Sequence, residues 1–222
     1  MTPPIYLIPG LGADQRNYPV CWRELPGCTC LEWPEYHGET SLPAVAKRMA
    51  EAWQIPDDAV LVGNSFGGAV ACELAKLQPV HTLVLVASAT SRESFAATAR
   101  MKVLTRILPL QVIQILLRWS RPTLEAIWGR SATPSTRGIL DSIQMFTVCQ
   151  SGFYRNMFQA VSTWEGFLDD KTRLIRIHGR HDKTVIVPTK ADLWLDGGHL
   201  ISMTHARECV DFIRTQIVTS AS

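Results

Sequence analysis

The sequence lacks an excess of charge of either sign. Its 222 residues include 22 Lys and Arg against 20 Asp and Glu, which gives a formal net charge of +2. A protein that binds nucleic acid through a broad surface needs a basic field that this balance does not provide. We therefore expect no nucleic-acid partner.

Long apolar runs are also missing. The longest candidate extends from Val103 to Trp119, and two arginines, a proline and two glutamines interrupt it. A helix needs about 18 to 20 consecutive apolar residues to cross a bilayer, so we expect no integral membrane segment. The beginning of the chain has neither a basic stretch nor a long apolar one, so we expect no secretory signal and a cytoplasmic location.

The six cysteines include no C-x-x-C pair. This spacing excludes the zinc-ribbon and thioredoxin-type sites that depend on such pairs. Without a secretory signal, a disulfide framework is not expected either. The sequence predicts reduced and mostly buried thiols.

What the sequence does contain is an alternation of short apolar runs with longer helical patterns. Hydrophobic residues make up 46% of the chain, as in a globular protein with one domain or one domain with an insertion. Nearly continuous apolar strands that alternate with helices predict a parallel sheet with both faces covered. We expect strands at Ile5–Ile8, Thr29–Trp33, Ala59–Gly63, Thr82–Ala87, Leu174–Ile177 and Leu193–Leu195, and helices at Leu42–Trp53 (with Ser41 as its cap), Phe66–Leu77 and roughly Thr204–Ile217.

The alternation stops between Ser91 and about Leu168. This stretch has no clear strand, and its apolar residues recur at helical spacing. They are Met101, Leu104 and Leu108, followed after Pro109 by Val112, Ile115, Leu116 and Trp119. The sequence therefore predicts an α/β core made of residues 1–90 and 169–222, with a helical cap inserted at 91–168.

The sharpest motif is Gly63-Asn64-Ser65-Phe66-Gly67, followed by Gly68. It comes after a predicted strand and opens a predicted helix, which is the context of a nucleophile elbow. Small residues flank such a serine because its backbone is strained, and the helix N-terminus behind it offers free N–H groups. The alternative is a glycine-rich turn that contains a serine by chance.

A serine nucleophile needs a base and an acid that orients the base. His199 follows the last predicted strand in Asp196-Gly197-Gly198-His199, and Asp182 follows the strand before it. We predict Ser65, Asp182 and His199 as a catalytic triad. Asp192 and Asp196 are the rivals for the acid, and a surface turn is the alternative role for Asp182.

The tetrahedral intermediate of such a reaction needs N–H donors for its oxyanion. One is expected from the backbone of Phe66, directly after the nucleophile. The other is expected from Leu11, in the glycine-containing loop Pro9-Gly10-Leu11-Gly12 after the first strand. A plain turn would explain these glycines too.

These motifs resemble the α/β-hydrolase family over most of the chain outside the insertion. The loop Ile8–Gly12, the segment Pro34–Ser41, the elbow Gly63–Gly68, His178-Gly179 with Asp182, and Gly198-His199 stand in the family's order. The resemblance implies an eight-stranded sheet. Because Ile5 already lies in what looks like the family's third strand, we expect a compact sheet of about six strands, all of them parallel.

The resemblance also implies a reaction. Serine at the elbow is similar to carboxylesterases, thioesterases and carbon–carbon hydrolases, whereas dehalogenases and epoxide hydrolases of the family carry aspartate. The implied activity is cleavage of a small-molecule ester through an acyl-enzyme, without metal or cofactor. A hydrolase-fold receptor that binds a small ligand with little turnover is an alternative.

The predicted cap offers apolar side chains that could form the walls of a substrate pocket: Phe146, Phe153, Tyr154, Met157, Phe158 and Trp164. Ordinary packing is the alternative for each of them. As a group they favour an ester with an apolar acyl or aryl part over a sugar or nucleotide.

Charge is unevenly distributed along the chain. The predicted cap has nine basic and four acidic residues, a net +5, and the remainder has 13 basic and 16 acidic residues, a net −3. Eight of the nine cap cations are arginine, including Arg118, Arg121 and Arg155, which suits contacts with phosphate or carboxylate. A capped hydrolase with cap arginines resembles the pimeloyl-acyl-carrier-protein methyl ester esterases of biotin synthesis, and this resemblance implies docking of an acyl carrier protein. A solvated surface and an anionic membrane surface are the alternatives.

Overall fold

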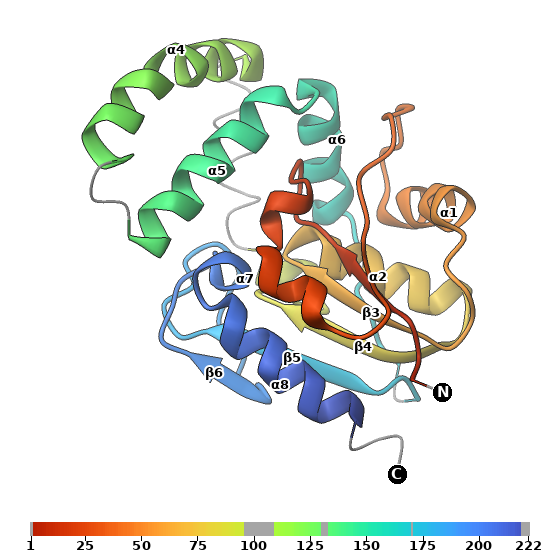
Figure 1. Ribbon diagram of the computed structural model, residues 1–222. Coiled ribbons are helices and arrows are strands. Elements are labelled where there is room, and N and C mark those ends of the chain that lie inside the picture. The colour runs from red at the N-terminus through yellow and green to blue at the C-terminus, as the bar shows by residue number, and fades with distance from the viewer. Residues whose placement is uncertain (1, 96–108, 130–132, 170, 219–222) are drawn as a thin grey trace.

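A computed structural model describes residues 2–95, 109–129, 133–169 and 171–218 of the protein. Its elements run from a first strand near the N-terminus to a long helix at the other end of the chain (Figure 1). In chain order they are β1 Ile5–Ile8, η1 Gln15–Asn17, η2 Val20–Glu24, β2 Cys28–Cys30, α1 Leu42–Trp53, β3 Ala59–Asn64, α2 Phe66–Leu77, β4 Val80–Val86, η3 Arg92–Ser94, α4 Leu110–Trp128, α5 Pro134–Val148, α6 Ser151–Ser162, β5 Leu174–Gly179, β6 Leu193–Leu195, α7 Ile201–Thr204 and α8 Ala206–Val218.

The strands that the structure describes form one six-stranded sheet in the order β2-β1-β3-β4-β5-β6. All neighbouring strands run parallel. This confirms the predicted compact parallel sheet. It also means that the carboxyl ends of all strands meet at one edge, where the loops that carry function collect.

Two apolar clusters fill the space on either side of the sheet, as expected for a parallel sheet. Successive strand residues alternate between them: Ile5 and Leu7 pack with η2 and α8, whereas Ile8 packs with α1 and α2. Every residue of β3 is buried. Such burial on both faces explains why the strands appear in the sequence as unbroken apolar runs.

The helix α1 has the predicted bounds because its start, apolar face and end are all encoded locally. The Ser41 side chain accepts the Ala44 N–H at 3.4 Å. Leu42, Val45 and Met49 are buried on one face. The helix ends at Trp53, and the next residue, Gln54, has a left-handed φ of 48°. A polar cap at one end and a left-handed residue at the other are the ordinary signals of a helix boundary.

Between β4 and β5 the chain forms the helices α4, α5 and α6, called the cap helices below. They lie together at one side of the molecule, away from α8 (Figure 1). The predicted spacing of Met101, Leu104 and Leu108 lies outside the described residues. Val112, Ile115, Leu116 and Trp119 fall on α4, where all four side chains are exposed.

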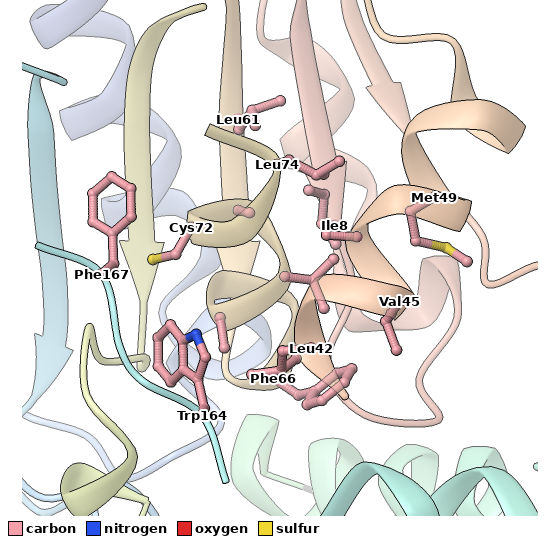
Figure 2. Packing of buried hydrophobic residues seen from close by; sticks show 14 of the residues in the cluster. Ile8, Leu42, Val45, Met49, Leu61, Phe66, Cys72, Leu74, Trp164 and Phe167 are labelled. Atoms are coloured by element: carbon pink, nitrogen blue, oxygen red, sulfur yellow. The ribbon is translucent and has the colours of Figure 1, made fainter. Parts of the chain in front are cut away.

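The segment after α6 returns to the core through two buried aromatic residues. Figure 2 shows Trp164 and Phe167 beside α2, on the opposite side from Val45 and Met49 of α1. The indole N–H of Trp164 donates to the buried Glu73 of α2 at 2.7 Å. These contacts fix the exit of the insertion against the sheet's helical layer.

Two elements differ from the prediction. The strand β2 is shorter than the expected Thr29–Trp33, and its pairing with β1 ends at Cys30. The expected last helix, roughly Thr204–Ile217, corresponds to α8, and the short helix α7, which was not expected, precedes it with His205 between the two. Strand β2 is a sheet edge with one neighbouring strand, so its sequence is held by fewer ladder bonds than that of a central strand.

Candidate active site

Ser65 lies at the turn between β3 and α2 in a backbone conformation that serine rarely adopts. Its φ is 51° and its ψ is −119°. Such strain costs about 1–3 kcal/mol and persists only where the surroundings enforce it. Here the Ser65 N–H donates to Val86 O at 3.0 Å, and its carbonyl accepts the Ser88 hydroxyl at 2.6 Å. The neighbouring strand β4 therefore holds the turn.

The glycines around Ser65 are required by close backbone contacts. A Cβ at Gly63 would overlap the backbone of Gly68, and a Cβ at Gly67 would overlap the carbonyls of Ile8 and Pro9. The space is thus occupied by main chain that has no rotamer to change. This is the physical reason for the G-x-S-x-G spacing at this turn.

His199 and Asp182 form a continuous hydrogen-bonded chain with Ser65. The Nε2 atom of His199 is 2.9 Å from Ser65 Oγ, and its Nδ1 atom is 2.9 Å from Asp182 Oδ2. A carboxylate can only accept, so Nδ1 carries the proton and Nε2 is left to accept from the serine. The structure therefore brings the three residues of the predicted triad together at the carboxyl edge of the sheet.

Asp182 is buried, yet it is held in its ionised form. Burial alone would raise the pKa of its carboxyl group, but the hydrogen bond from His199 and those from the backbone N–H groups of Val185 and Thr184 outweigh burial and lower the pKa. Asp182 is therefore a fixed negative charge beside the imidazole.

A second histidine also approaches Asp182. His178 is buried, and its Nε2 lies 3.4 Å from Asp182 Oδ2 without the geometry of a hydrogen bond. Burial lowers the pKa of His178. The imidazole is therefore neutral next to the triad and leaves the carboxylate to His199.

The rival acids are engaged elsewhere. Asp196 is exposed and lies 2.8 Å from His181 Nε2. Asp192 accepts the backbone N–H of Arg176 at 2.7 Å. Each carboxylate therefore has a partner outside the triad.

Two backbone N–H groups near Ser65 have no acceptor within the described part of the chain. They belong to Phe66, at the first position of α2, and to Leu11, in the loop after β1. The Leu11 loop is fixed on both sides: the Gly10 N–H donates to Asn17 Oδ1 at 2.8 Å, and the Tyr154 hydroxyl donates to Leu11 O at 2.8 Å. An oxyanion that develops on a substrate bound next to Ser65 could therefore accept hydrogen bonds from these two N–H groups, as in the tetrahedral intermediate of acyl transfer.

A cavity of about 380 Å³ opens above the triad. Its walls are mainly apolar and come from both the sheet edge and the cap helices. Tyr154 and Phe158 of α6 line it, as do Ser65, Phe66 and His199. An apolar cavity with a few convergent polar groups is the ordinary form of a small-molecule site.

The other aromatic or apolar cap residues singled out in the sequence lie elsewhere. Phe153 packs against Trp33, Tyr36 and Phe66 and borders a second cavity of about 250 Å³. Phe146 makes an edge contact with Tyr154 at 4.9 Å between ring centres. Met157 and Trp164 are buried in the core.

Sequence reasoning missed several residues that line the cavity. They are Asn17, Phe95, Ser142, Met145, Val161, Thr184 and Leu200. Leu200 directly follows His199 in the loop after β6, and Phe95 follows η3 in the segment after β4, so both lie in connections that leave the carboxyl edge of the sheet. That position in the chain was the one available signal for them.

The arginines singled out in the sequence have different surroundings. Arg118 and Arg155 are exposed, and no acidic partner lies beside either within the described residues. Arg121 pairs with Glu125 one turn further along α4, at 2.7 Å.

The described part of the chain contains no group of three or more His, Cys, Asp or Glu side chains arranged for a metal ion. None of its helices is both long enough and apolar enough to traverse a bilayer.

A family comparison agrees with this fold. The family model described as the alpha/beta hydrolase family matches residues 5–212. The chain therefore belongs to the alpha/beta hydrolase family. A search of the curated proteins found no match.

Solved structures with the same fold include esterases and a lactonase. A thermophilic esterase from Thermogutta terrifontis aligns with a TM-score of 0.70 and 17% identity, covering 98% of this chain and 90% of that one. A carboxylesterase structure from Nitrososphaera gargenis aligns with a TM-score of 0.70 and 15% identity, covering 100% and 92%. The enol-lactonase from Burkholderia xenovorans aligns with a TM-score of 0.68 and 15% identity, covering 99% and 92%. At these identities the likeness shows the fold.

Proposed function

We propose that this hydrolase cleaves carboxylic esters with an apolar acyl part, using Ser65 as the nucleophile. The observation that carries the proposal is the unbroken chain from Ser65 Oγ through His199 to the buried Asp182, with each hydrogen bond 2.9 Å long. A serine hydroxyl is a weak nucleophile until a base removes its proton, and this chain supplies that base.

The reaction follows from the geometry. His199 Nε2 takes the hydroxyl proton while Ser65 Oγ forms a bond to the ester carbonyl carbon, and the carbonyl electrons move onto the oxygen. The N–H groups of Phe66 and Leu11 stabilise this oxyanion, each by about 3–4 kcal/mol. The carbon–oxygen bond to the alcohol then breaks, and the alcohol takes the proton from His199.

The acyl group remains on Ser65 until water removes it. His199 takes a proton from the water molecule as its oxygen attacks the acyl carbon, and returns it to Ser65 Oγ when the acid leaves. Asp182 stays ionised throughout and stabilises the imidazolium form of His199, because its pKa is below the ordinary value. The apolar walls of the cavity favour an apolar acyl group over a sugar or nucleotide.

Replacement of the nucleophile tests the proposal. Ser65→Ala is expected to lower kcat on p-nitrophenyl butyrate by about 10⁴-fold or more and to abolish labelling by a fluorophosphonate. Ser120→Ala is the matched control, since this hydroxyl bonds the Leu117 carbonyl within α4. Retained turnover in Ser65→Ala would contradict the proposal, and labelling without turnover on a broad ester panel would indicate a ligand-binding protein instead.

A second candidate is an ester carried by an acidic acyl carrier protein, for which a thioester is a related substrate. The specific support is the exposure of Arg118 and Arg155 on the cap helices, without acidic partners beside them in the described residues. Arg118→Glu and Arg155→Glu are expected to lower kcat/KM on a carrier-linked ester at least about tenfold more than on the free ester. Equal effects on both substrates would exclude carrier docking at these arginines.

A further inference from the structure

We propose that Trp33 is a positioning residue of the oxyanion hole. The inference rests on the proposed function and deepens it. The N–H group expected to face the oxyanion belongs to Leu11, and the carbonyl of the same peptide unit belongs to Gly10. This carbonyl accepts the indole N–H of Trp33 at 2.9 Å and the backbone N–H of Ala13 at 3.1 Å.

A peptide unit is planar, and in the trans form its C=O and N–H point in opposite directions. The direction in which the Gly10 carbonyl is held therefore decides the direction of the Leu11 N–H. Gly10 has no side chain to restrict its backbone, so this restriction has to come from outside. Trp33 and Ala13 supply it at the carbonyl, and Asn17 supplies it on the preceding peptide unit at 2.8 Å.

Hydrogen bonding at the carbonyl also polarises the peptide unit. A chain of hydrogen bonds strengthens each member, so a Gly10 carbonyl with two donors leaves the Leu11 N–H a stronger donor. This effect acts where charge develops on the substrate oxygen, which is the transition state rather than the bound ester.

Trp33 is itself held rigidly. Its ring lies 5.4 Å from Trp53, 5.7 Å from Phe66 and 5.8 Å from Phe153, measured between ring centres. These partners come from α1, α2 and α6. Phe66 carries the other proposed oxyanion donor. The indole of Trp33 therefore contacts the Phe66 ring and also donates a hydrogen bond to the peptide unit that carries the Leu11 N–H.

Two neighbouring residues make the same kind of bond without this consequence. Trp53 donates its indole N–H to Glu32 O at 3.0 Å, in the peptide unit between Glu32 and Trp33 and not in the loop that carries the Leu11 N–H. Tyr154 donates to Leu11 O at 2.8 Å, which orients the next peptide unit and its Gly12 N–H. Trp53 is therefore a matched control for the removal of an indole N–H in the same aromatic cluster.

The experiment replaces one indole N–H by sulfur while keeping the shape of the ring. Benzothienylalanine is incorporated at position 33 in one variant and at position 53 in the other, with thermal unfolding as the check on the fold. The substrates are p-nitrophenyl butyrate and its thionoester, whose carbonyl sulfur accepts hydrogen bonds poorly.

For position 33, kcat and kcat/KM on the oxygen ester are expected to fall together by about tenfold, with KM unchanged, because the lost interaction belongs to the transition state. The rate ratio between the oxygen ester and the thionoester is expected to shrink by a similar factor. For position 53 both values are expected to stay within about twofold of the parent. Trp33→Phe, which also lacks the N–H, is expected to follow the analogue at position 33.

The inference would be overturned by equal losses on both esters, by equal losses at positions 33 and 53, or by an unchanged rate at position 33. These outcomes leave Ser65 as the nucleophile, provided that Ser65→Ala removes turnover and fluorophosphonate labelling. Failure of the proposed function has a different signature, since turnover would then persist in Ser65→Ala itself.

Discussion

The central strands of the sheet and the helix α4 differ in how far their apolar side chains are buried. Strand β3 buries every residue, and the glycines beside Ser65 are enclosed by main chain. On α4, by contrast, Leu116 is 61% exposed and Trp119 is 81% exposed. The difference separates two kinds of environment: main-chain contacts enclose Ser65 and its flanking glycines at the sheet edge, whereas α4 leaves several large apolar side chains open to solvent.

The largest expected effect on rate lies at the sheet edge. Asp182→Asn is expected to lower kcat by about 10⁴-fold, since an amide cannot hold His199 in the tautomer with a proton on Nδ1. The cavity and the fold are expected to remain, because the amide oxygen can still accept the Thr184 and Val185 N–H groups. Steady-state kinetics and thermal unfolding measure the two results, and a loss of less than about tenfold would contradict the triad.

The same substitution is also expected to change how the free energy of unfolding depends on pH. The native pKa of Asp182 lies below its ordinary value, so the ionised carboxylate stabilises the fold above about pH 4, the pKa of an unfolded aspartate. This stabilisation is lost as pH falls through the native pKa. Denaturant unfolding of Asp182→Asn across the acid range is therefore expected to show a shallower loss of stability than the parent. Parallel curves for the two proteins would contradict the lowered pKa.

Replacing a glycine by alanine is expected to change stability in opposite directions at the sheet edge and at the end of α4. Gly67→Ala places a Cβ against the carbonyls of Ile8 and Pro9, so we expect about 3 kcal/mol of destabilisation or more and loss of activity. Gly129→Ala, at the end of α4 with φ of −64°, meets nothing within 4 Å in the described residues and is expected to stabilise by about 0.5 kcal/mol. Denaturant unfolding measures both, and similar effects at both positions would remove the distinction between the regions.

The sequence predicts most of the fold because strands and helices are encoded by neighbours in the chain. The six-stranded parallel sheet and the family are confirmed. The locations of Ser65, Asp182 and His199 follow from the same logic, since each lies in the connection that follows a strand of a parallel sheet. The predicted ends of the strands therefore located most of the candidate site residues.

What the sequence could not predict depends on packing between distant segments. Phe153 and Phe158 lie five positions apart on α6, and only their rotation against the core decides that Phe158 lines the cavity above the triad. The sequence predicts Trp33 as the last residue of a strand, but β2 ends at Cys30. The indole N–H of Trp33 donates to the carbonyl of Gly10, a contact between residues 23 positions apart that no local pattern indicates.

These two phenylalanines test the comparison within the cap helices. Phe153→Ala is expected to cost about 3–5 kcal/mol, because a buried ring in contact with Trp33 and Phe66 is lost. Phe158→Ala is expected to cost less stability and to shift the preference towards longer acyl chains, since it enlarges the cavity. Unfolding curves and a series of p-nitrophenyl esters of increasing acyl length measure the two effects. If Phe158→Ala lost more stability and Phe153→Ala shifted the acyl-length preference, α6 would have to be rotated relative to this structure.

The smallest effect is expected on the exposed face of α4. Trp119→Gln removes a ring that is 81% exposed, so the free energy of unfolding and kcat on a free ester are expected to stay within about 0.5 kcal/mol and about twofold of the parent. Gln144→Ala on α5 is the polar control for a neighbouring helix. A destabilisation of about 2 kcal/mol or more by Trp119→Gln would mean that this face of α4 is covered in solution, and the contrast between the buried sheet and the exposed face of α4 would then fail.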